Sequence, residues 1–204
     1  RPIEERWAEI VQHVKDEYLS TAQTYPWIVG FSGGKDSTVV AHVVFEALQA
    51  IPPSQRTRPV HIVSNDTMVE SPLVMAHLDE VSSQIQAAVN NLSLPFTVAR
   101  TRPDPDKTFW VLLIGKGYPS PNQQMRWCTD RLKIQPTSTY IKDNVSKYGA
   151  AVVVLGVRRT ESIRRMRTVD KYENDRGSNL NPHSSITGAY IFRPIVDLTT
   201  DDVW

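Results

Sequence analysis

The sequence predicts an α/β fold: a doubly wound, mostly parallel five-stranded sheet with helices on both faces. Three observations lead to this prediction. Short runs rich in valine and isoleucine alternate along the chain with segments of helical periodicity. Strands that alternate with helices need crossover connections, which favour a parallel sheet. Polar clusters follow the first, second and fourth strand candidates, at the edge where parallel sheets bind their ligands.

The elements are expected in the following order. Residues 3–20 form an amphipathic helix, because apolar side chains recur there at helical spacing. The helix after the second strand begins at Ser71 and Pro72, which supply a capping hydroxyl and a proline at the first helical position. The strands are expected at residues 27–31, 60–64, 96–100, 151–155 and 190–195, and further helices at 37–45 and 136–147.

Three segments depart from this regular alternation. Residues 101–126 are predicted to be irregular, apart from a short apolar helix near residues 109–114. Residues 168–188 are polar and poor in aliphatic side chains, which predicts a mobile loop. Residues 199–204 combine a capping hydroxyl, acidic residues and apolar residues, like the first turn of a helix, so we expect the natural protein to continue.

Composition indicates one ordinary globular domain over residues 1–204. The chain is 40% hydrophobic and 22% charged, and its net charge of +1 gives no global preference for a polyanionic partner. No apolar run approaches the length of a membrane span, and the charged start does not read as a signal peptide. The single cysteine excludes an internal disulfide framework, so we expect a cytoplasmic protein without membrane partners.

The most informative segment is residues 32–37, which join the first strand candidate to a helix. Gly33 and Gly34 let the backbone approach an anion, and the start of the helix adds N–H groups and positive potential. Lys35 adds a mobile cation, while Ser32 and Ser37 add hydroxyl donors. These residue types in this order predict a phosphate-binding loop.

This loop is not a Walker A motif, because Val29 stands where that motif has glycine and Asp36 follows the lysine. It resembles the PP-loop of the ATP pyrophosphatase superfamily. The resemblance implies ATP as cofactor, cleaved between the α and β phosphates with Mg²⁺. It makes Lys35 and Asp36 candidate catalytic residues and Asp36 a candidate magnesium ligand. The alternative is a glycine- and serine-rich turn without function.

Asp66 follows the second strand candidate. In the superfamily that this chain resembles, this strand end lies beside the adenosine, so Asp66 is a candidate nucleotide-binding residue. An ordinary turn is the alternative, because aspartate and asparagine favour turns.

An arginine-rich cluster follows the fourth strand candidate. Gly156 permits close approach of backbone, and Glu161 can fix an arginine fork. Arg158 is expected at the catalytic phosphate and Arg159 in the same pocket, because the cluster lies at a ligand-binding strand end. A solvated charged face is the alternative. The segment resembles a motif of phosphoadenylylsulfate reductases, and it continues with Arg164, Arg165 and Arg167.

Cys128 lies in a third cluster, residues 126–133. A lone cysteine is most often a small packed side chain. Here Arg126, Arg131 and Lys133 would favour the thiolate if they lie close. A nucleophile, a persulfide carrier and one ligand of an iron–sulfur cluster all remain open, although a cluster needs about four thiolates and the chain has one cysteine.

Nearly the whole chain resembles the DndC-type sulfurtransferases of DNA phosphorothioation systems. That family exchanges a non-bridging phosphate oxygen of DNA for sulfur. The resemblance implies DNA as substrate, a cysteine desulfurase as sulfur donor, other phosphorothioation subunits as partners, and an iron–sulfur cluster held by the equivalent of Cys128 with cysteines beyond this chain. It is carried by residues 26–38, 64–72, 109–110, 114–119, 126–133, 156–162, 183–185 and 200–204.

Two other functions remain open from the sequence. A phosphoadenylylsulfate reductase would use the same loop for a phosphosulfate, but it needs a catalytic cysteine near its C-terminus. A non-catalytic subunit would bind ATP only to scaffold the desulfurase or DNA. A turnover assay with ATP separates an enzyme from a scaffold, and competition between adenylylsulfates and DNA separates the two enzymes.

Overall fold

The computed structural model describes residues 2–20, 25–161 and 180–204. Its centre is a six-stranded sheet with the order β3-β2-β1-β4-β6-β5. All neighbouring strands are parallel except β5, which pairs antiparallel with β6. The strands are β1 (Trp27–Gly30), β2 (Val60–Asn65), β3 (Phe96–Thr101), β4 (Ala151–Val154), β5 (Asn181–Pro182) and β6 (Ala189–Phe192).

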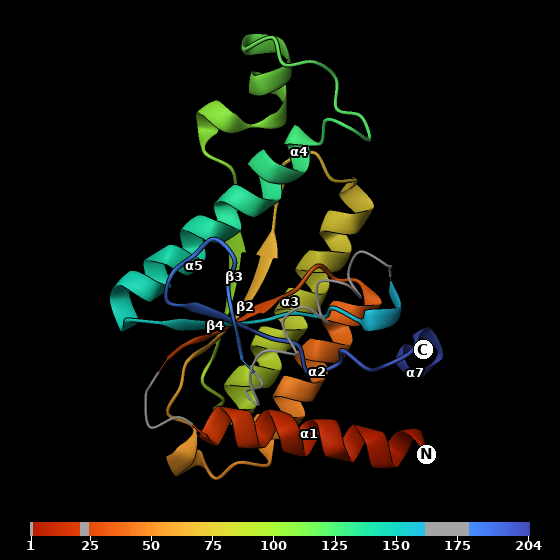
Figure 1. The fold of residues 1–204 in the computed structure, drawn as a ribbon, viewed down its shortest axis with the longest axis vertical. Coiled ribbons are helices and arrows are strands. Elements are labelled where there is room, and N and C mark those ends of the chain that lie inside the picture. Colours follow the sequence, from red (N-terminus) through yellow and green to blue (C-terminus); the bar gives the residue numbers. More distant parts are fainter. Residues whose placement is uncertain (1, 21–24, 162–179) are drawn as a thin grey trace.

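Helices cover both faces of this sheet, as predicted (Figure 1). α1 (Ile3–Leu19), α2 (Lys35–Gln49) and α3 (Pro72–Leu92) lie on one face, and α5 (Gln135–Tyr148) lies on the other. The alternation of side chains along β1 explains the two layers: Trp27 and Val29 join the core on the α1–α3 side, whereas Ile28 packs on the α5 side.

The predicted number of five strands is wrong by one, because β5 was not expected. Asn181 and Pro182 lie inside the segment for which a mobile loop was predicted, and proline is suited only to an edge strand. Two residues are too short to show strand periodicity. Residues 168–179 of the predicted loop lie outside the described residues.

Most other predicted elements are confirmed. Ser71 caps α3, where its hydroxyl accepts a hydrogen bond from the backbone N–H of Leu73. Thr199 caps α7 (Thr200–Val203) in a reciprocal arrangement with Asp202. The short helices include 3₁₀ turns at Pro53–Gln55, Pro105–Lys107 and Arg159–Glu161.

The segment between β3 and α5 rises beyond the end of the sheet (Figure 1, green, top). It contains a π-helical turn, Val111–Gly115, where a short helix was predicted. α4 (Trp127–Thr129) follows and runs through a second π-helical turn, Asp130–Ile134, directly into α5. Among the described residues, no helix is long and apolar enough to cross a membrane.

Candidate functional site

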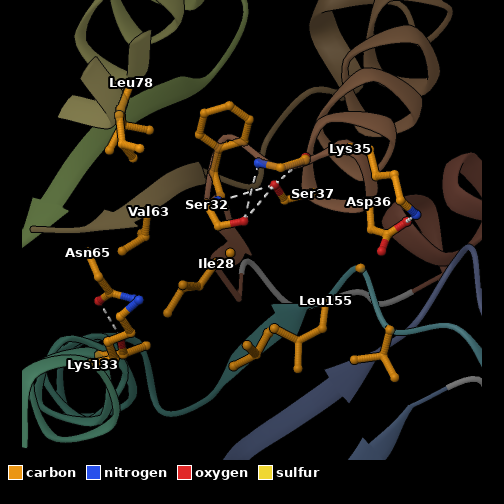
Figure 2. A pocket seen from close by; sticks show the side chains of 18 of the residues that line it. Ile28, Ser32, Lys35, Asp36, Ser37, Val63, Asn65, Leu78, Lys133 and Leu155 are labelled. Carbon is orange, nitrogen blue, oxygen red and sulfur yellow. Dashed lines mark hydrogen bonds and ion pairs between the residues drawn. The ribbon is translucent and has the colours of Figure 1, made fainter. Parts of the chain in front are cut away.

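A cavity of about 600 Å³ lies at the carboxyl ends of β1, β2 and β4. The chain leaves β1 toward β2 on one side and returns to β4 on the other, so this is the topological switch point where α/β sheets bind ligands. Figure 2 shows the loop after β1 on one side of the cavity, facing Asn65 and Lys133 on the other. The polar lining residues are Ser32, Lys35, Asp36, Ser37, Asn65, Glu70, Lys133 and Thr137.

The loop Ser32–Ser37 forms one wall, and hydrogen bonds within it fix its shape. The Ser32 backbone N–H donates to Ser37 Oγ at 3.2 Å, and Ser37 Oγ donates to the Gly34 carbonyl at 2.9 Å. The φ angle of Gly33 is +74°, a conformation that favours glycine. Gly34 is the N-cap of α2 and has no side chain to accept from the first helical N–H groups. The loop therefore has the form of an anion site.

Lys35 and Asp36 begin α2 and lie beside each other. Lys35 Nζ is 3.2 Å from Asp36 Oδ1 and 5.9 Å from the ring centroid of Trp204. Trp204 is 87% exposed, so the lysine is held at the rim rather than in the interior. A lysine with so light a restraint is able to turn toward a bound phosphate.

Arg158 contacts Asp36 from beneath the loop. Its Nε donates to Asp36 Oδ1 at 2.9 Å and its Nη2 to Asp36 Oδ2 at 3.4 Å. Arg158 is 2% exposed, and its Nη1 donates to the hydroxyls of Thr160 and Thr200. Burial works to raise the pKa of the Asp36 carboxyl, but hydrogen bonds from Arg158 and Lys35 outweigh it and hold this pKa below its ordinary value.

This geometry changes the roles expected for two residues. Arg158 does not line the cavity, and its guanidinium contacts the loop residue Asp36 instead. Asp36 lines the cavity, but its carboxylate already forms ion pairs with Lys35 and Arg158. These pairs make it a poor ligand for Mg²⁺ in this arrangement. Among the described residues, no group of three His, Cys, Asp or Glu side chains is placed to hold a metal ion.

Gly156 lines the cavity and approaches the loop closely. A Cβ atom at this position would lie 2.9 Å from the Asp36 carbonyl oxygen and 3.2 Å from the Ser37 backbone nitrogen. The close approach predicted for Gly156 is confirmed, and its partner is the backbone at the start of α2. Only glycine lets the end of β4 pack against the loop in this way.

Arg159 is not brought to the cavity lining, and the side chain of Glu161 lies outside the described part of the chain. The Arg159 backbone N–H donates to the Val196 carbonyl at 2.8 Å, and its Nε is 3.3 Å from Asp197 Oδ1. Glu161 ends the 3₁₀ turn Arg159–Glu161. Arg164, Arg165 and Arg167 lie outside the described residues. A shared phosphate pocket for this cluster stays a prediction, and the described geometry supports it for Gly156 only.

Asp66 forms a turn and an ion pair. Its Oδ1 accepts from the Met68 N–H at 2.9 Å, and its Oδ2 is 2.9 Å from Arg102 Nε. The neighbouring Asn65, which the sequence analysis did not select, lines the cavity. Asn65 Oδ1 accepts hydrogen bonds from the hydroxyls of Thr101 and Thr137. Both carboxylate oxygens of Asp66 therefore have partners, Oδ1 in the turn and Oδ2 in the ion pair, and a nucleotide-binding role for Asp66 stays a prediction.

Cys128 is half-buried in α4, on the helix that carries Lys133 and Thr137 into the cavity. Arg131 lies near Asp130, and Lys133 Nζ is 3.2 Å from Glu70 Oε1, so both cations have acidic partners. As the only cysteine, Cys128 does not suffice to hold an iron–sulfur cluster. The residues of this chain therefore do not fit the cluster without ligands from elsewhere.

Lys133, Glu70 and Thr137 are cavity residues that no motif assigned to the site. They come from two parts of the chain, the segment after β2 and the helical segment that leads into α5, and the approach of α5 to the end of β2 brings them together. Lys133 had been noted solely as a neighbour of Cys128. Lys133 lines the cavity, whereas Arg131, two residues earlier on the same helical turn, does not.

Comparison with known proteins decides the family. The model of the phosphoadenosine phosphosulfate reductase domain matches residues 26–204. The chain belongs to this family. An uncharacterised protein from Methanocaldococcus jannaschii is 26% identical to this reductase-like domain over 140 residues, which is 69% of the chain but 24% of that relative's length.

Solved structures share the fold of this reductase-like domain. Phosphoadenylyl-sulfate reductase from Candida auris is 12% identical, with a TM-score of 0.52 over 98% of this chain and 81% of its own. The U34-tRNA thiolase NcsA from Methanococcus maripaludis is 13% identical, with a TM-score of 0.53 over 98% of this chain and 62% of its own. NAD⁺ synthetase from Burkholderia pseudomallei is 14% identical, with a TM-score of 0.56 over 100% of this chain and 73% of its own.

Proposed function

We propose that this chain is the ATP-activating domain of a DNA phosphorothioation enzyme. It cleaves ATP to AMP and pyrophosphate and uses the adenylyl group to activate a DNA backbone phosphate for exchange of a non-bridging oxygen by sulfur. The observation that carries the ATP part is the anion-binding loop Ser32–Ser37 at one end of a cavity of about 600 Å³, within the range of nucleotide sites. The choice of DNA rests on the sequence resemblance to DndC-type sulfurtransferases.

The loop is suited to the pyrophosphate end of ATP. Backbone N–H groups at the start of α2 and the Ser32 and Ser37 hydroxyls surround the oxyanions, and the helix N-terminus adds positive potential. Lys35 turns from Asp36 toward the phosphates and stabilises the charge of the leaving pyrophosphate. Asp36, paired with Arg158, keeps the loop in place. Mg²⁺ carried by the nucleotide would supply neutralisation of the triphosphate charge.

Adenylation solves the problem of a poor leaving group. A non-bridging oxygen of the DNA phosphodiester attacks the α-phosphorus of ATP, and pyrophosphate leaves with the electron pair of the cleaved bond. The same oxygen is then part of a phosphoanhydride. A sulfur nucleophile attacks the DNA phosphorus, and AMP departs with that oxygen. The reaction needs a sulfur donor, for which we propose a cysteine desulfurase, with Cys128 on the adjoining helix as the residue that receives sulfur as a persulfide. The outer persulfide sulfur attacks phosphorus, and a thiol reductant then supplies the two electrons that cleave the S–S bond to Cys128 and leave sulfur on the DNA.

A phosphoadenylylsulfate reductase is the second candidate, and the family match over residues 26–204 favours it. In that case the cavity holds a nucleotide that already carries sulfate, and the loop binds an anionic group of this substrate. No pyrophosphate would be formed. The two functions therefore differ in whether the β and γ phosphates of ATP are part of the substrate.

Transfer of label from ATP to DNA tests the proposal. The chain is incubated with Mg²⁺, ATP labelled at the α-phosphate and duplex DNA, without a sulfur donor, so that adenylated DNA accumulates. We expect label on DNA and competition by unlabelled ATP. DNA that stays unlabelled, together with tighter binding of phosphoadenylylsulfate than of ATP, would assign the chain to the reductases. ATP binding with no product of either kind would indicate a scaffold.

A further inference from the structure

Positive charge is concentrated in the segment that rises beyond the sheet. Residues 100–133 contain seven lysines and arginines but three aspartates and no glutamate, whereas the whole chain has a net charge of +1. The rest of the chain is therefore net acidic. Figure 1 places this segment at the carboxyl end of β2 and β3, at the same end of the sheet as the nucleotide cavity. An uneven charge distribution of this kind attracts a polyanion to one side of the molecule.

Four of these cations surround a second hollow, which we call the basic groove. Arg100, Arg102, Lys107 and Arg131 line this hollow of about 250 Å³ between the end of β3 and the start of α5. Two carboxylates, Asp104 and Asp143, also line it, so cations outnumber acids in the groove.

The acidic partners of these cations are mostly exposed, and their ion pairs are correspondingly weak. Lys107 Nζ lies 2.6 Å from Asp104 Oδ2, with the two side chains 42% and 65% exposed. Arg131 Nε lies 3.7 Å from Asp130 Oδ2, with exposures of 38% and 51%. Exposed pairs of this kind are readily exchanged for contacts to phosphate, to which arginine binds with two parallel hydrogen bonds.

The basic groove and the nucleotide cavity share a wall. Asn65 and Thr137 line the cavity, Thr101 lines the groove, and Asn65 Oδ1 accepts hydrogen bonds from both threonine hydroxyls. The π-helical turn Asp130–Ile134 runs along the same boundary. It presents Lys133 to the cavity and Arg131 to the groove, because residues two apart lie on opposite sides of a helix. Cations therefore continue from one hollow into the other.

We propose that the basic groove binds the phosphodiester backbone of the DNA substrate beside the phosphate that reacts in the cavity. This inference rests on the proposed function, because it assigns a surface to the DNA that the activation chemistry requires. A chain of phosphates extends past the reacting one, and a second cationic hollow across a shared wall is placed to hold its neighbour. Contacts to phosphate position a nucleic acid without reading its sequence.

The test compares DNA binding by charge-neutralising variants inside and outside the groove. Lys107→Gln and the double variant Lys107→Gln/Arg131→Gln remove groove cations, and Lys15→Gln removes one matched charge from α1, at the opposite end of the sheet. Affinity for a labelled 20-base-pair duplex is measured by fluorescence anisotropy over a series of salt concentrations. Thermal melting verifies that each variant folds, and ATP affinity and pyrophosphate release are measured separately.

We expect the double variant to bind DNA about tenfold or more weakly than wild type, and the slope of log affinity against log salt to fall by about two. Lys107→Gln should lower that slope by about one, and Lys15→Gln should leave it unchanged. Equal losses in Lys15→Gln and Lys107→Gln, an unchanged slope in the double variant, or tighter binding of a matched RNA duplex would overturn the proposal. DNA binding that depends on the groove cations, without release of pyrophosphate, would support the groove as a DNA-binding surface but contradict the proposed ATP cleavage.

Discussion

At the residue scale, Arg158 is a buried charge that contacts the loop residue Asp36 without lining the cavity. The guanidinium is 2% exposed and holds both carboxylate oxygens of Asp36, 122 residues away in sequence. Removal of Arg158 would leave the largely buried Asp36 carboxylate with Lys35 as its remaining cationic partner. Because Asp36 belongs to the first turn of α2, loss of this ion pair should destabilise the anion-binding loop Ser32–Ser37.

Arg158→Ala should therefore lower both the stability and the nucleotide affinity of the chain. We expect a loss of about 3 kcal/mol in the free energy of unfolding, measured by urea denaturation. The double variant Asp36→Asn/Arg158→Leu should recover much of that stability, since it removes both charges, but it should not recover ATP affinity. Full ATP affinity in Arg158→Ala would show that the pair does not position the loop.

Gly156→Ala tests the close contact between the end of β4 and the loop. The new Cβ would meet backbone atoms of Asp36 and Ser37 at 2.9–3.2 Å, and backbone cannot move aside as a flexible side chain can. We expect at least tenfold weaker ATP binding by calorimetry, which is about 1.4 kcal/mol. Gly115→Ala is the matched control, because its Cβ would have its nearest neighbour at 3.8 Å. Equal affinities of the two variants would rule out the contact as a determinant of the site.

At the element scale, the packing of α5 on β2 contains a half-buried histidine, His61. His61 of β2 has its Nδ1 2.6 Å from the Tyr140 hydroxyl of α5, and its buried Nε2 has no partner among the described residues. Burial, with a smaller contribution from Lys147, holds the pKa of His61 below its ordinary value. The folded chain therefore resists protonation that the unfolded chain accepts.

The free energy of unfolding should fall as the pH is lowered from about 7 to 5, because the unfolded state binds more protons over this range. His183, whose pKa is also lowered by burial, adds to the same trend. His61→Phe preserves an aromatic ring and should flatten, but not abolish, the dependence in urea denaturation. An identical slope in wild type and His61→Phe would show that β2–α5 packing does not depend on the neutral imidazole.

At the scale of the whole molecule, the sequence predicted the features whose determining residues lie close together along the chain. The strands β1 and β4 could be predicted because burial on both faces makes them continuous apolar runs. The loop Ser32–Ser37 could be predicted because all its determinants lie within six residues. β5 was missed because Asn181–Pro182 is too short to carry a period.

The remaining site geometry depends on contacts between distant segments. Arg158 was expected at phosphate, since its sequence position marks a strand end, but only tertiary packing directs its side chain to Asp36. Asn65, Glu70 and Thr137 had no motif of their own and meet where α5 crosses the end of β2. For Cys128, Arg159 and Glu161, the functional roles stay predictions.

The position at which ATP is cleaved tests the account most directly. Products from ATP labelled at the γ-phosphate are separated after incubation with Mg²⁺ and DNA, for wild type and for Lys35→Ala and Ser37→Ala. The account predicts labelled pyrophosphate for wild type, with an equimolar amount of the AMP moiety attached to DNA. It also predicts at least tenfold slower release in each variant, since each removes a group that lines the cavity where we propose that the pyrophosphate binds. Labelled orthophosphate with ADP, or wild-type rates in both variants, would contradict it.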